Sequence, residues 1–571
     1  AGRDLRPGDI RPGPGRAGTV NTCPAKGSDN ARVWDTSKRA IQIVLNNLKG
    51  IFFRDDDLEQ MTFSGTGRRG GNRYHDPPHL SFSRSRRLRL GTSLSGLMNG
   101  YSQAQFGYSD TMTRAQFLVV LTRMLGWQTP SMEEADADIT PAMALPEELS
   151  SQYRYAIACA AAHDVIEKTE PFRPNSPATR AEMAELLVRA LGLKACATDA
   201  EKENSLPFTD VSDKRGYIAV AYEIGMTKGL TDTTFGPDRT ATRAQAAAML
   251  VRIYEKLQQQ TAFVHGFYAI SSYSQLSLAQ RMDDVSAGWS RMTWDGTAAT
   301  LNTTAEGGNE YHIPSGYEEV TASLSHLNLS VFMDGQELKE MLTSESGRTQ
   351  AVQQIVGEVS KTYSQIGRNP YEGVTIDFEG LRAPQKEAFS DFLRQLQPAL
   401  QKLDKKLLVC VPPVLATSAY YDGYDYRAIG ELADRVILMA YGYGPQNMTG
   451  FTGTEYYKTA ATTPIASVYT ALKYAVSEIA PSKLLLGFSA ASTAWKIDEN
   501  GKLVSETPVY PSNETVIKRL SQSDTEHGWS QTYQQSYAIY RTEDGSRYFL
   551  WYQDASSVQA ALNAARLLGV N

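Results

Sequence analysis

Two hydrophobic patterns follow one another along the chain. Between about residues 92 and 257, apolar residues recur at helical spacing, as in "FLVVLTRMLGW" and "MAELLVRALGL". From about residue 262 onward, short apolar segments of strand-forming residues alternate with amphipathic stretches. The first pattern predicts helical modules, and the second predicts a sheet whose strands are joined by helices.

The helical part contains a sequence that recurs three times. "FGYSDTMTRAQF" begins at 106, "FRPNSPATRAEM" at 172 and "FGPDRTATRAQA" at 235. In each copy a Thr precedes Arg-Ala and is followed three residues later by Gln or Glu, which is the pattern of a helix capping box. We therefore expect three helices, with Arg114, Arg180 and Arg243 at their first positions.

These arginines stand where the helix dipole disfavours a cation. Three arginines at the same position of the recurring sequence indicate a role for this side chain, and the spacing leaves two explanations of that role open. The guanidinium groups could bind an anionic ligand beside the free amides of each helix start. Alternatively, the arginine stems could pack over a neighbouring module.

The T-R-A-[QE] sequence resembles the S-layer homology repeat, which attaches bacterial surface proteins to a pyruvylated, anionic wall polysaccharide. The resemblance implies an extracellular protein at the bacterial cell wall or S-layer, with Arg114, Arg180 and Arg243 as the polymer-binding residues. The first repeat lacks a recognisable leading helix. We place a partial first repeat at 92–133, a second repeat at 134–195 and a third at 204–258.

The second half of the chain contains seven candidate strands separated by helical stretches such as 351–366 and 387–403. Repeated strand–helix units over 262–571 predict an α/β domain, a (β/α)8 TIM barrel. The segment 537–553, with its Asp-Gly turn, is predicted to be an inserted hairpin. The candidate strands are 263–269, 288–294, 327–333, 373–379, 407–412, 435–441 and 484–489.

An eighth strand is expected directly after a predicted helix at about 555–568, where this chain ends at Asn571. We therefore expect a barrel truncated before its eighth strand, with the first and seventh strands flanking a gap that Val570 enters. Unpaired edges of this kind are costly, so we also expect poor stability or inactivity, and a natural protein that continues past Asn571.

The fourth candidate strand carries two acids at its end. In "YEGVTIDFEG" (371–380), Asp377 and Glu379 are two residues apart, so on a strand their side chains lie on one face. Two like charges there cost free energy unless one carboxyl is protonated or each has a partner. In a barrel of this kind, catalytic groups stand at this end of the strands. The residues alone leave both a structural and a catalytic explanation open.

"EGVTIDFE" resembles the DGxDxDxE signature of glycoside hydrolase family 18, the chitinase family, and "MAYGY" (439–443) resembles a segment on its sixth strand. "WYQDASS" (551–557) is similar to a late segment of the wall-associated and spore-cortex glucosaminidase branch. The resemblance implies hydrolysis of β-1,4 bonds next to N-acetylglucosamine, in peptidoglycan or a chitin-like glycan, with no metal or cofactor.

The family resemblance also implies roles for single residues. Glu379 is the implied general acid, and the acetamide of the substrate acts as nucleophile in place of a protein group. Asp377 and Tyr441 are the implied partners of that acetamide. Further sugar contacts are expected from Tyr443, Met439 and Trp551.

Three positions depart from the signature. Glu372 and Thr375 replace its first and middle Asp, and Gly442 replaces the Asp after Tyr441. Without these acids, the aiming of the acetamide is weakened. A second hypothesis is therefore a non-catalytic surface protein that binds glycan with a degenerate barrel.

Charge and composition exclude several other classes. The net charge of −6 argues against general nucleic-acid binding, and the four cysteines lack metal-ligand spacing. No apolar run approaches the length needed to span a bilayer. Residues 1–91 are basic and rich in Arg, Gly and Pro, so we leave them unassigned and expect them to be disordered or read in the wrong frame.

Overall fold

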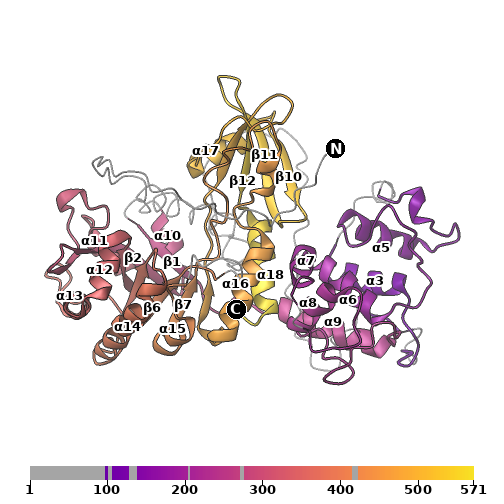
Figure 1. The fold of residues 1–571 in the computed structure, drawn as a ribbon, viewed down its shortest axis with the longest axis horizontal. Coiled ribbons are helices and arrows are strands. Elements are labelled where there is room, and N and C mark those ends of the chain that lie inside the picture. The colour runs from indigo at the N-terminus through magenta and orange to yellow at the C-terminus, as the bar shows by residue number, and fades with distance from the viewer. Residues whose placement is uncertain (1–96, 101–105, 128–137, 204–205, 270–274, 415–421) are drawn as a thin grey trace, which may run out of the picture.

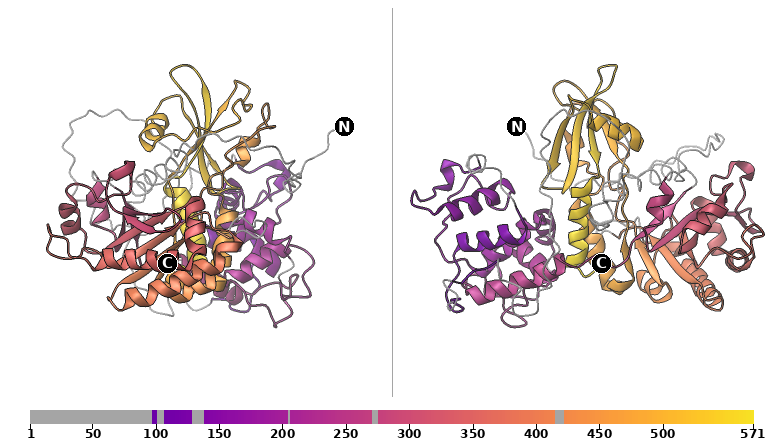
Figure 2. Two further views of the ribbon diagram at one scale, coloured as in Figure 1. Left: turned by 60° about the vertical axis from the view of Figure 1, so that its left-hand side comes forward. Right: turned by 180° about the vertical axis from the view of Figure 1, so that it is seen from behind.

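The computed structural model describes residues 97–100, 106–127, 138–203, 206–269, 275–414 and 422–571. The basic segment 1–91 lies outside the described residues. Figure 1 shows the helical repeats on one side of the molecule and a parallel sheet with its helices on the other. A four-stranded sheet stands between and above them, and the view from behind in Figure 2 shows this sheet projecting above α18.

Helices form the described part of the repeats. The three predicted helix starts are confirmed, because Thr113, Thr179 and Thr242 each form a complete capping box. These Thr residues precede α3, α6 and α9 respectively. The helices of the repeats are α3 (Arg114–Met124), α5 (Ser151–Ala162), α6 (Arg180–Ala190), α7 (Lys194–Ala200), α8 (Arg215–Glu223) and α9 (Arg243–Leu257), with the short η2 (Pro141–Met143).

The three helix starts and three loops close a ring. A helix start leaves amide groups without partners inside the helix. Here the first amide of each of the three helices donates to a carbonyl in the Phe-containing loop of another repeat, and the second amide does the same. The first-position bonds are Arg114 N to Ser176 O (3.0 Å), Arg180 N to Arg239 O (3.0 Å) and Arg243 N to Asp110 O (2.8 Å). The recurring sequence is therefore the joint between repeats.

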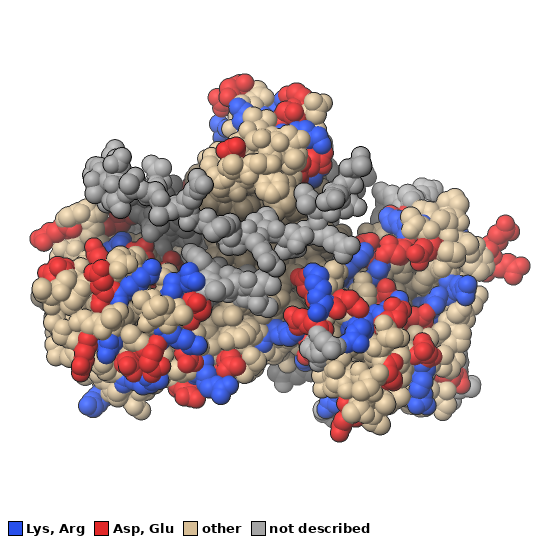
Figure 3. Space-filling model, in the orientation of Figure 1, with Lys and Arg blue, Asp and Glu red and all other residues tan. Residues whose placement is uncertain are grey.

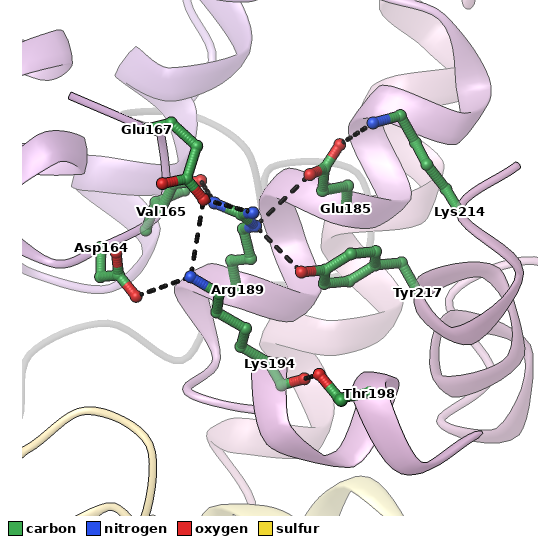
Figure 4. Close-up of polar contacts among 9 residues, drawn as sticks. All are labelled: Asp164, Val165, Glu167, Glu185, Arg189, Lys194, Thr198, Lys214 and Tyr217. Atoms are coloured by element: carbon green, nitrogen blue, oxygen red, sulfur yellow. Dashed lines mark hydrogen bonds and ion pairs between the residues drawn. The ribbon is translucent and has the colours of Figure 1, made fainter. Parts of the chain in front are cut away.

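Arg189 of α6 joins further elements of this ring (Figure 4). Its guanidinium lies 2.7 Å from a Glu167 oxygen and donates to the Val165 carbonyl at 3.4 Å, both in the turn after α5. It also donates to the Tyr217 hydroxyl of α8 at 3.1 Å. Lys214 pairs with Glu185 of α6 beside this network. Charged side chains thus fix α6 against its neighbours.

A parallel sheet forms the core of the second half, in the order β1-β2-β4-β5-β6-β7-β8, and β3 pairs with β2 in antiparallel fashion. All seven predicted strands overlap these seven parallel strands. Within the described residues β1 and β8 pair with other strands but not with each other, so the curled sheet is open. The strands are β1 (His265–Tyr268), β2 (Asp284–Trp294), β3 (Ala299–Asn302), β4 (Leu327–Met333), β5 (Gly373–Phe378), β6 (Lys406–Val411), β7 (Arg435–Leu438) and β8 (Leu484–Leu486).

Helices cover the outer side of this sheet (Figure 1). The seven parallel strands and their helices form a curled α/β half-barrel, which is consistent with the predicted (β/α)8 barrel truncated before its eighth strand. The helices are α10 (Leu276–Ala279), α11 (Tyr317–Ser323), α12 (Gly335–Thr343), α13 (Glu345–Ser360), α14 (Lys386–Gln401), α15 (Tyr426–Leu432), α16 (Ile465–Glu478) and α18 (Ala555–Leu567), with the short η4 (Glu306–Gly308), η5 (Ala383–Gln385), η7 (Tyr456–Thr459) and η8 (Pro481–Lys483).

A second sheet is inserted between β8 and α18, in the antiparallel order β10-β11-β12-β9. The predicted hairpin is confirmed as β11 and β12, but the sheet is twice as large as the sequence indicated. Its elements are β9 (Thr493–Ile497), α17 (Asn513–Leu520), β10 (Glu526–Ser530), β11 (Gln535–Arg541) and β12 (Arg547–Tyr552).

The third repeat and the α7 segment that precedes it pack against the outer helices of the half-barrel. Helix α7 contacts α16, and α9 contacts α18. Lys473 of α16 lies 2.9 Å from a Glu203 oxygen and 2.8 Å from a Glu223 oxygen. Lys256 of α9 donates to the Leu567 carbonyl at the end of α18 at 2.6 Å. Charged contacts therefore join the two halves of the chain.

Candidate active site

Strand β5 carries the two acids into the end of the parallel sheet. Every residue of β5 is buried, and Asp377 retains only 3% of its exposure. Glu379 follows the strand, and its amide donates to the Met333 carbonyl at the end of β4 (3.0 Å). Both carboxyl groups thus stand at the carboxyl end of the parallel strands, with Glu379 partly open to solvent.

The carboxyl of Glu379 is held in its acid form. Removal from water raises its pKa, and the charges of Asp377 and Asp334 raise it further, from 4.5 to about 8. A carboxyl with this pKa carries a proton at neutral pH, whereas its neighbours supply negative charge. This is the division of roles that a general acid beside an anionic partner requires.

Tyr441 stands with these acids at the end of β7. Burial raises the pKa of its hydroxyl well above the ordinary value, and the charges of Asp377 and Glu379 add to that rise. Gly487, just beyond β8, makes room for the ring. A Cβ on Gly487 would lie 3.1 Å from Tyr441 Cε1 and 2.9 Å from the Leu438 carbonyl oxygen. The predicted trio of Glu379, Asp377 and Tyr441 is therefore brought together.

Hydroxyl groups line β5 below Asp377. Thr375 is fully buried, and its hydroxyl lies 2.5 Å from the Ser286 hydroxyl, which lies 2.9 Å from Nε2 of His265. The second ring nitrogen of His265 is 3.5 Å from Asp284. A chain of hydroxyl groups and an imidazole thus occupies the place where the signature has its middle acid.

Three residues that sequence reasoning missed also lie at this end of the sheet. Arg291 of β2 pairs in register with Phe332 of β4, and Phe332 pairs with Asp377. Arg291 also binds Asp334 at 2.9 Å, and Tyr311 stacks on Phe332 with 5.1 Å between ring centroids. Arg291, Tyr311 and Asp334 belong to no motif, so only the register of three adjacent strands could have indicated them.

The predicted sugar contacts are less well placed than the acids. Met439 packs against the cluster of Leu408, Cys410, Ile437 and Leu485 on the central strands. The Tyr443 hydroxyl donates to the carbonyl of Ser467 in α16 at 3.5 Å.

Trp551 is a correction to the sequence prediction. It is 1% exposed, and its indole N–H donates to the Tyr457 carbonyl at 3.0 Å. Its ring packs among Tyr533, Tyr537 and Phe549 in the core of the inserted sheet. A side chain sealed in this way cannot stack on a sugar, so we remove it from the site.

The predicted polymer-binding arginines are a second correction. Arg180 and Arg243 are each 5% exposed, so the structure supports the packing explanation. Arg180 donates to the Phe235 carbonyl (2.9 Å) and the Thr227 hydroxyl (3.2 Å), and it lies over the Phe235 ring.

Arg243 makes the equivalent contacts with the first repeat. It donates to the carbonyls of Phe106 (3.1 Å) and Asn99 (2.6 Å) and lies over the Phe106 ring. Arg114 is more exposed and forms an ion pair with Glu182 of the second repeat. Each arginine thus reaches from its own repeat to another, which explains a cation at a helix start.

Other chemistries find little support in the described part of the chain. No group of three or more His, Cys, Asp or Glu side chains there could hold a metal ion. The thiols of Cys159, Cys196 and Cys410 are free and buried. None of the helices described is long and apolar enough to cross a membrane.

Comparison with known proteins identifies the class. Residues 240–570 match glycosyl hydrolases family 18, and this match spans more than half of the chain. Residues 149–184 and 207–247 match the S-layer homology domain. The chain therefore belongs to glycosyl hydrolases family 18 and carries S-layer homology sequence ahead of that domain.

Several relatives share only part of their length with this chain. The cortical fragment-lytic enzyme of Bacillus subtilis (strain 168) is 26% identical over 206 residues, which are 36% of this chain and 45% of that enzyme. The enzyme of the same name from Bacillus anthracis is 24% identical over 200 residues, 34% of this chain and 44% of that enzyme. The chain thus spans about half the length of the curated relatives it matches.

Solved structures of low sequence identity also resemble the chain. The spore cortex-lytic enzyme SleL of Bacillus megaterium QM B1551 is 18% identical, with a TM-score of 0.43 over 62% of this chain and 76% of SleL. A family 18 chitinase of Cycas revoluta, solved in complex with (GlcNAc)3, is 16% identical, with a TM-score of 0.39 over 53% of this chain and 92% of the chitinase.

Proposed function

We propose that this protein is a wall-associated glycosidase that cleaves β-1,4 bonds next to N-acetylglucosamine, in peptidoglycan or a chitin-like glycan. The observation that carries the proposal is the place of Glu379, directly after β5 and two residues from the buried carboxyl group of Asp377. Burial and the charges of Asp377 and Asp334 raise the pKa of Glu379 to about 8, which favours its protonated form at neutral pH. Family membership adds the expectation of glycoside hydrolysis.

In the proposed first step, Glu379 donates its proton to the glycosidic oxygen, and the bond from that oxygen to the anomeric carbon breaks. The carbonyl oxygen of the substrate's own acetamide attacks the same carbon, so no protein nucleophile is needed. In the second step, water attacks the anomeric carbon and gives a proton to the Glu379 carboxylate, while the bond from that carbon to the acetamide oxygen breaks and the acetamide is regenerated. Two inversions give net retention of configuration.

Asp377 and Tyr441 have supporting roles in this proposal. The Asp377 carboxylate accepts from the acetamide N–H and stabilises the positive charge of the cyclic intermediate. The Tyr441 hydroxyl, whose raised pKa keeps its proton in place, donates to the acetamide carbonyl oxygen. Thr375 is uncharged, so Asp377 shares no proton with a second acid at that position.

We further propose that the repeats attach the enzyme to an anionic wall polysaccharide at the cell surface. The match to the S-layer homology domain supports attachment. Because Arg180 and Arg243 are buried in the joints between repeats, other residues of the repeats are the better candidates for the polymer contacts. On the face drawn in Figure 3, acidic and basic side chains are interspersed over both the repeats and the half-barrel.

The proposal is tested by assaying the full chain on chitooligosaccharides and on purified peptidoglycan, beside Glu379→Gln. Asp422→Asn serves as the control, because Asp422 belongs to an ion pair with Arg382 in the loop region after β5. We expect cleavage of at least one substrate by the wild type and the control, and none by Glu379→Gln. If all three proteins are equally inactive on both substrates, the proposal that this protein is a glycosidase is rejected.

A second candidate function is glycan binding without catalysis. Thr375 and Gly442 favour it, because both positions lack the acid of the family signature. Gly442 has φ +75°, a left-handed conformation that an Asp side chain adopts only with strain. Binding of chitooligosaccharide with equal affinity by wild type and Glu379→Gln, without turnover, would support this alternative.

A further inference from the structure

Asp334 lies beside the proposed acid although it is distant in sequence. Strands β4 and β5 run parallel, with Met333 paired to Phe378. The Glu379 amide donates to the Met333 carbonyl at 3.0 Å, so the two strands end at the same level. Asp334 and Glu379 are the next residues of the two strands, and their carboxyl groups leave the sheet at neighbouring positions.

The side chain of Asp334 does not cap the helix that it precedes. Asp334 precedes α12, where an Asp commonly accepts a hydrogen bond from an amide of the first helical turn. Here it makes no such cap and instead binds Nη2 of Arg291 at 2.9 Å. A capping hydrogen bond would stabilise α12, so the ion pair directs this carboxylate at the expense of the helix.

Arg291 is itself fixed in orientation. Its guanidinium lies 5.3 Å from the ring centroid of Phe332 and 5.7 Å from that of Tyr311. These two rings are buried and stacked on each other. The register Arg291–Phe332–Asp377 places the arginine on the same side of the sheet as the acids. The ion pair therefore has a fixed position at the end of β2 and β4.

We propose that the Arg291–Asp334 ion pair is a positioning element of the glycosidase reaction, holding a carboxylate beside Glu379 in a chain where Thr375 replaces the middle acid of the signature. This inference rests on the proposed function. Asp334 touches no reacting atom and acts through Glu379, because a nearby negative charge favours the protonated form of an acid. The pKa of Glu379 rises through burial first, then through Asp377 and then Asp334.

Two substitutions test the proposal. Asp334→Asn removes a negative charge, so the alkaline limb of the kcat/KM profile should move to lower pH, by about half to one unit. Arg291→Gln removes the partner that holds Asp334 in place, so the same limb should also move to lower pH, by a smaller amount. Asp334→Glu should restore most of the wild-type profile. No movement in Asp334→Asn, or movement to higher pH in Arg291→Gln, would overturn the proposal.

A readout that needs no turnover separates this proposal from the proposed function. The Glu379 carboxyl can be titrated by 13C NMR in the glutamate-labelled full chain, with its resonance assigned by its loss in Glu379→Gln. We expect a midpoint near 8 in wild type, a lower midpoint in Asp334→Asn and no change in the Asp422→Asn control. An inactive wild type with these midpoints would reject the glycosidase but retain the charge coupling. Identical midpoints in wild type and Asp334→Asn would reject the coupling even if the enzyme is active.

Discussion

The joints between the repeats and the end of β5 both place charges where simple physical chemistry disfavours them, and they resolve the conflict differently. At the joints, Arg180 and Arg243 stand at positive helix ends, but carbonyl groups and an aromatic ring of another repeat surround each guanidinium. At β5, burial and the negative charges of Asp377 and Asp334 raise the pKa of the Glu379 carboxyl group. The first arrangement stabilises the fold, whereas the second favours the protonated form of Glu379.

An unusual charge is therefore not by itself a sign of function. The test is whether the surrounding structure provides compensating partners. For Arg180 the partners are a carbonyl, a hydroxyl and a ring, all within the repeats. For Glu379 the named neighbours Asp377 and Asp334 increase the cost of ionisation. Structural explanations suffice in the repeats, and a catalytic explanation is favoured at β5.

The largest effect should come from Asp377→Asn. The amide cannot carry the negative charge that stabilises the cyclic intermediate, and it also lowers the proton affinity of Glu379. We expect kcat to fall by about 100-fold or more. Steady-state kinetics on the cleaved substrate, with circular dichroism to confirm folding, measure this loss. A folded variant with more than a tenth of wild-type kcat would place Asp377 outside the mechanism.

Arg180→Ala should have the next largest effect, on stability. It removes buried hydrogen bonds from a charged group and leaves their acceptors unpaired, so we expect a loss of about 2–4 kcal/mol. Arg114→Ala is the matched control, because its ion pair is more exposed and should contribute less than about 1 kcal/mol. Urea unfolding of both variants measures the difference.

The same two variants also test whether the arginines bind the wall polymer. If Arg180→Ala remains as stable as the wild type but no longer sediments with purified cell-wall sacculi, Arg180 contacts the wall polymer. In that case the structural explanation of the repeat sequence is wrong.

Tyr441→Phe should have a smaller effect on catalysis. It removes one hydroxyl from the proposed acetamide contact and leaves the ring in the space that Gly487 provides for it. We expect kcat to fall about fivefold with KM changed little, because one neutral hydrogen bond contributes about 1 kcal/mol. A rise in KM at constant kcat would assign Tyr441 to substrate binding alone.

Stability should also depend on pH. The folded chain holds the Glu379 proton up to a pKa of about 8, whereas the unfolded chain releases it near 4.5. Stability contributed by this proton is therefore present below pH 4.5 and is lost as pH rises to 8. Unfolding curves of wild type and Glu379→Gln should diverge over this window, with the wild type losing stability relative to the variant. Parallel curves would show an ordinary carboxyl.

Sequence reasoning recovered those parts that are encoded locally. Strand-forming runs such as 327–333 coincide with β4, and the Thr of each recurring sequence caps its helix. It failed where the decisive partner is remote. The contacts of Arg180 with Phe235 span two repeats, and Asp334 reaches Glu379 only through the pairing of β4 with β5.

The prediction for Trp551 was wrong because the sequence did not indicate its burial. An aromatic residue in a family-like segment suggested sugar stacking, but β9 and β10 were not recognised as strands. Without them, the sheet that encloses Trp551 could not be anticipated. The same omission made a four-stranded insertion look like a single hairpin.

The most direct test of the central claim is the stereochemistry of hydrolysis by the full chain. The anomeric protons of freshly cleaved chitooligosaccharide can be followed by time-resolved 1H NMR, with Glu379→Gln in parallel. The account predicts that the β-anomer appears first and that Glu379→Gln produces neither anomer. Initial release of the α-anomer, or cleavage that persists in Glu379→Gln, would contradict it.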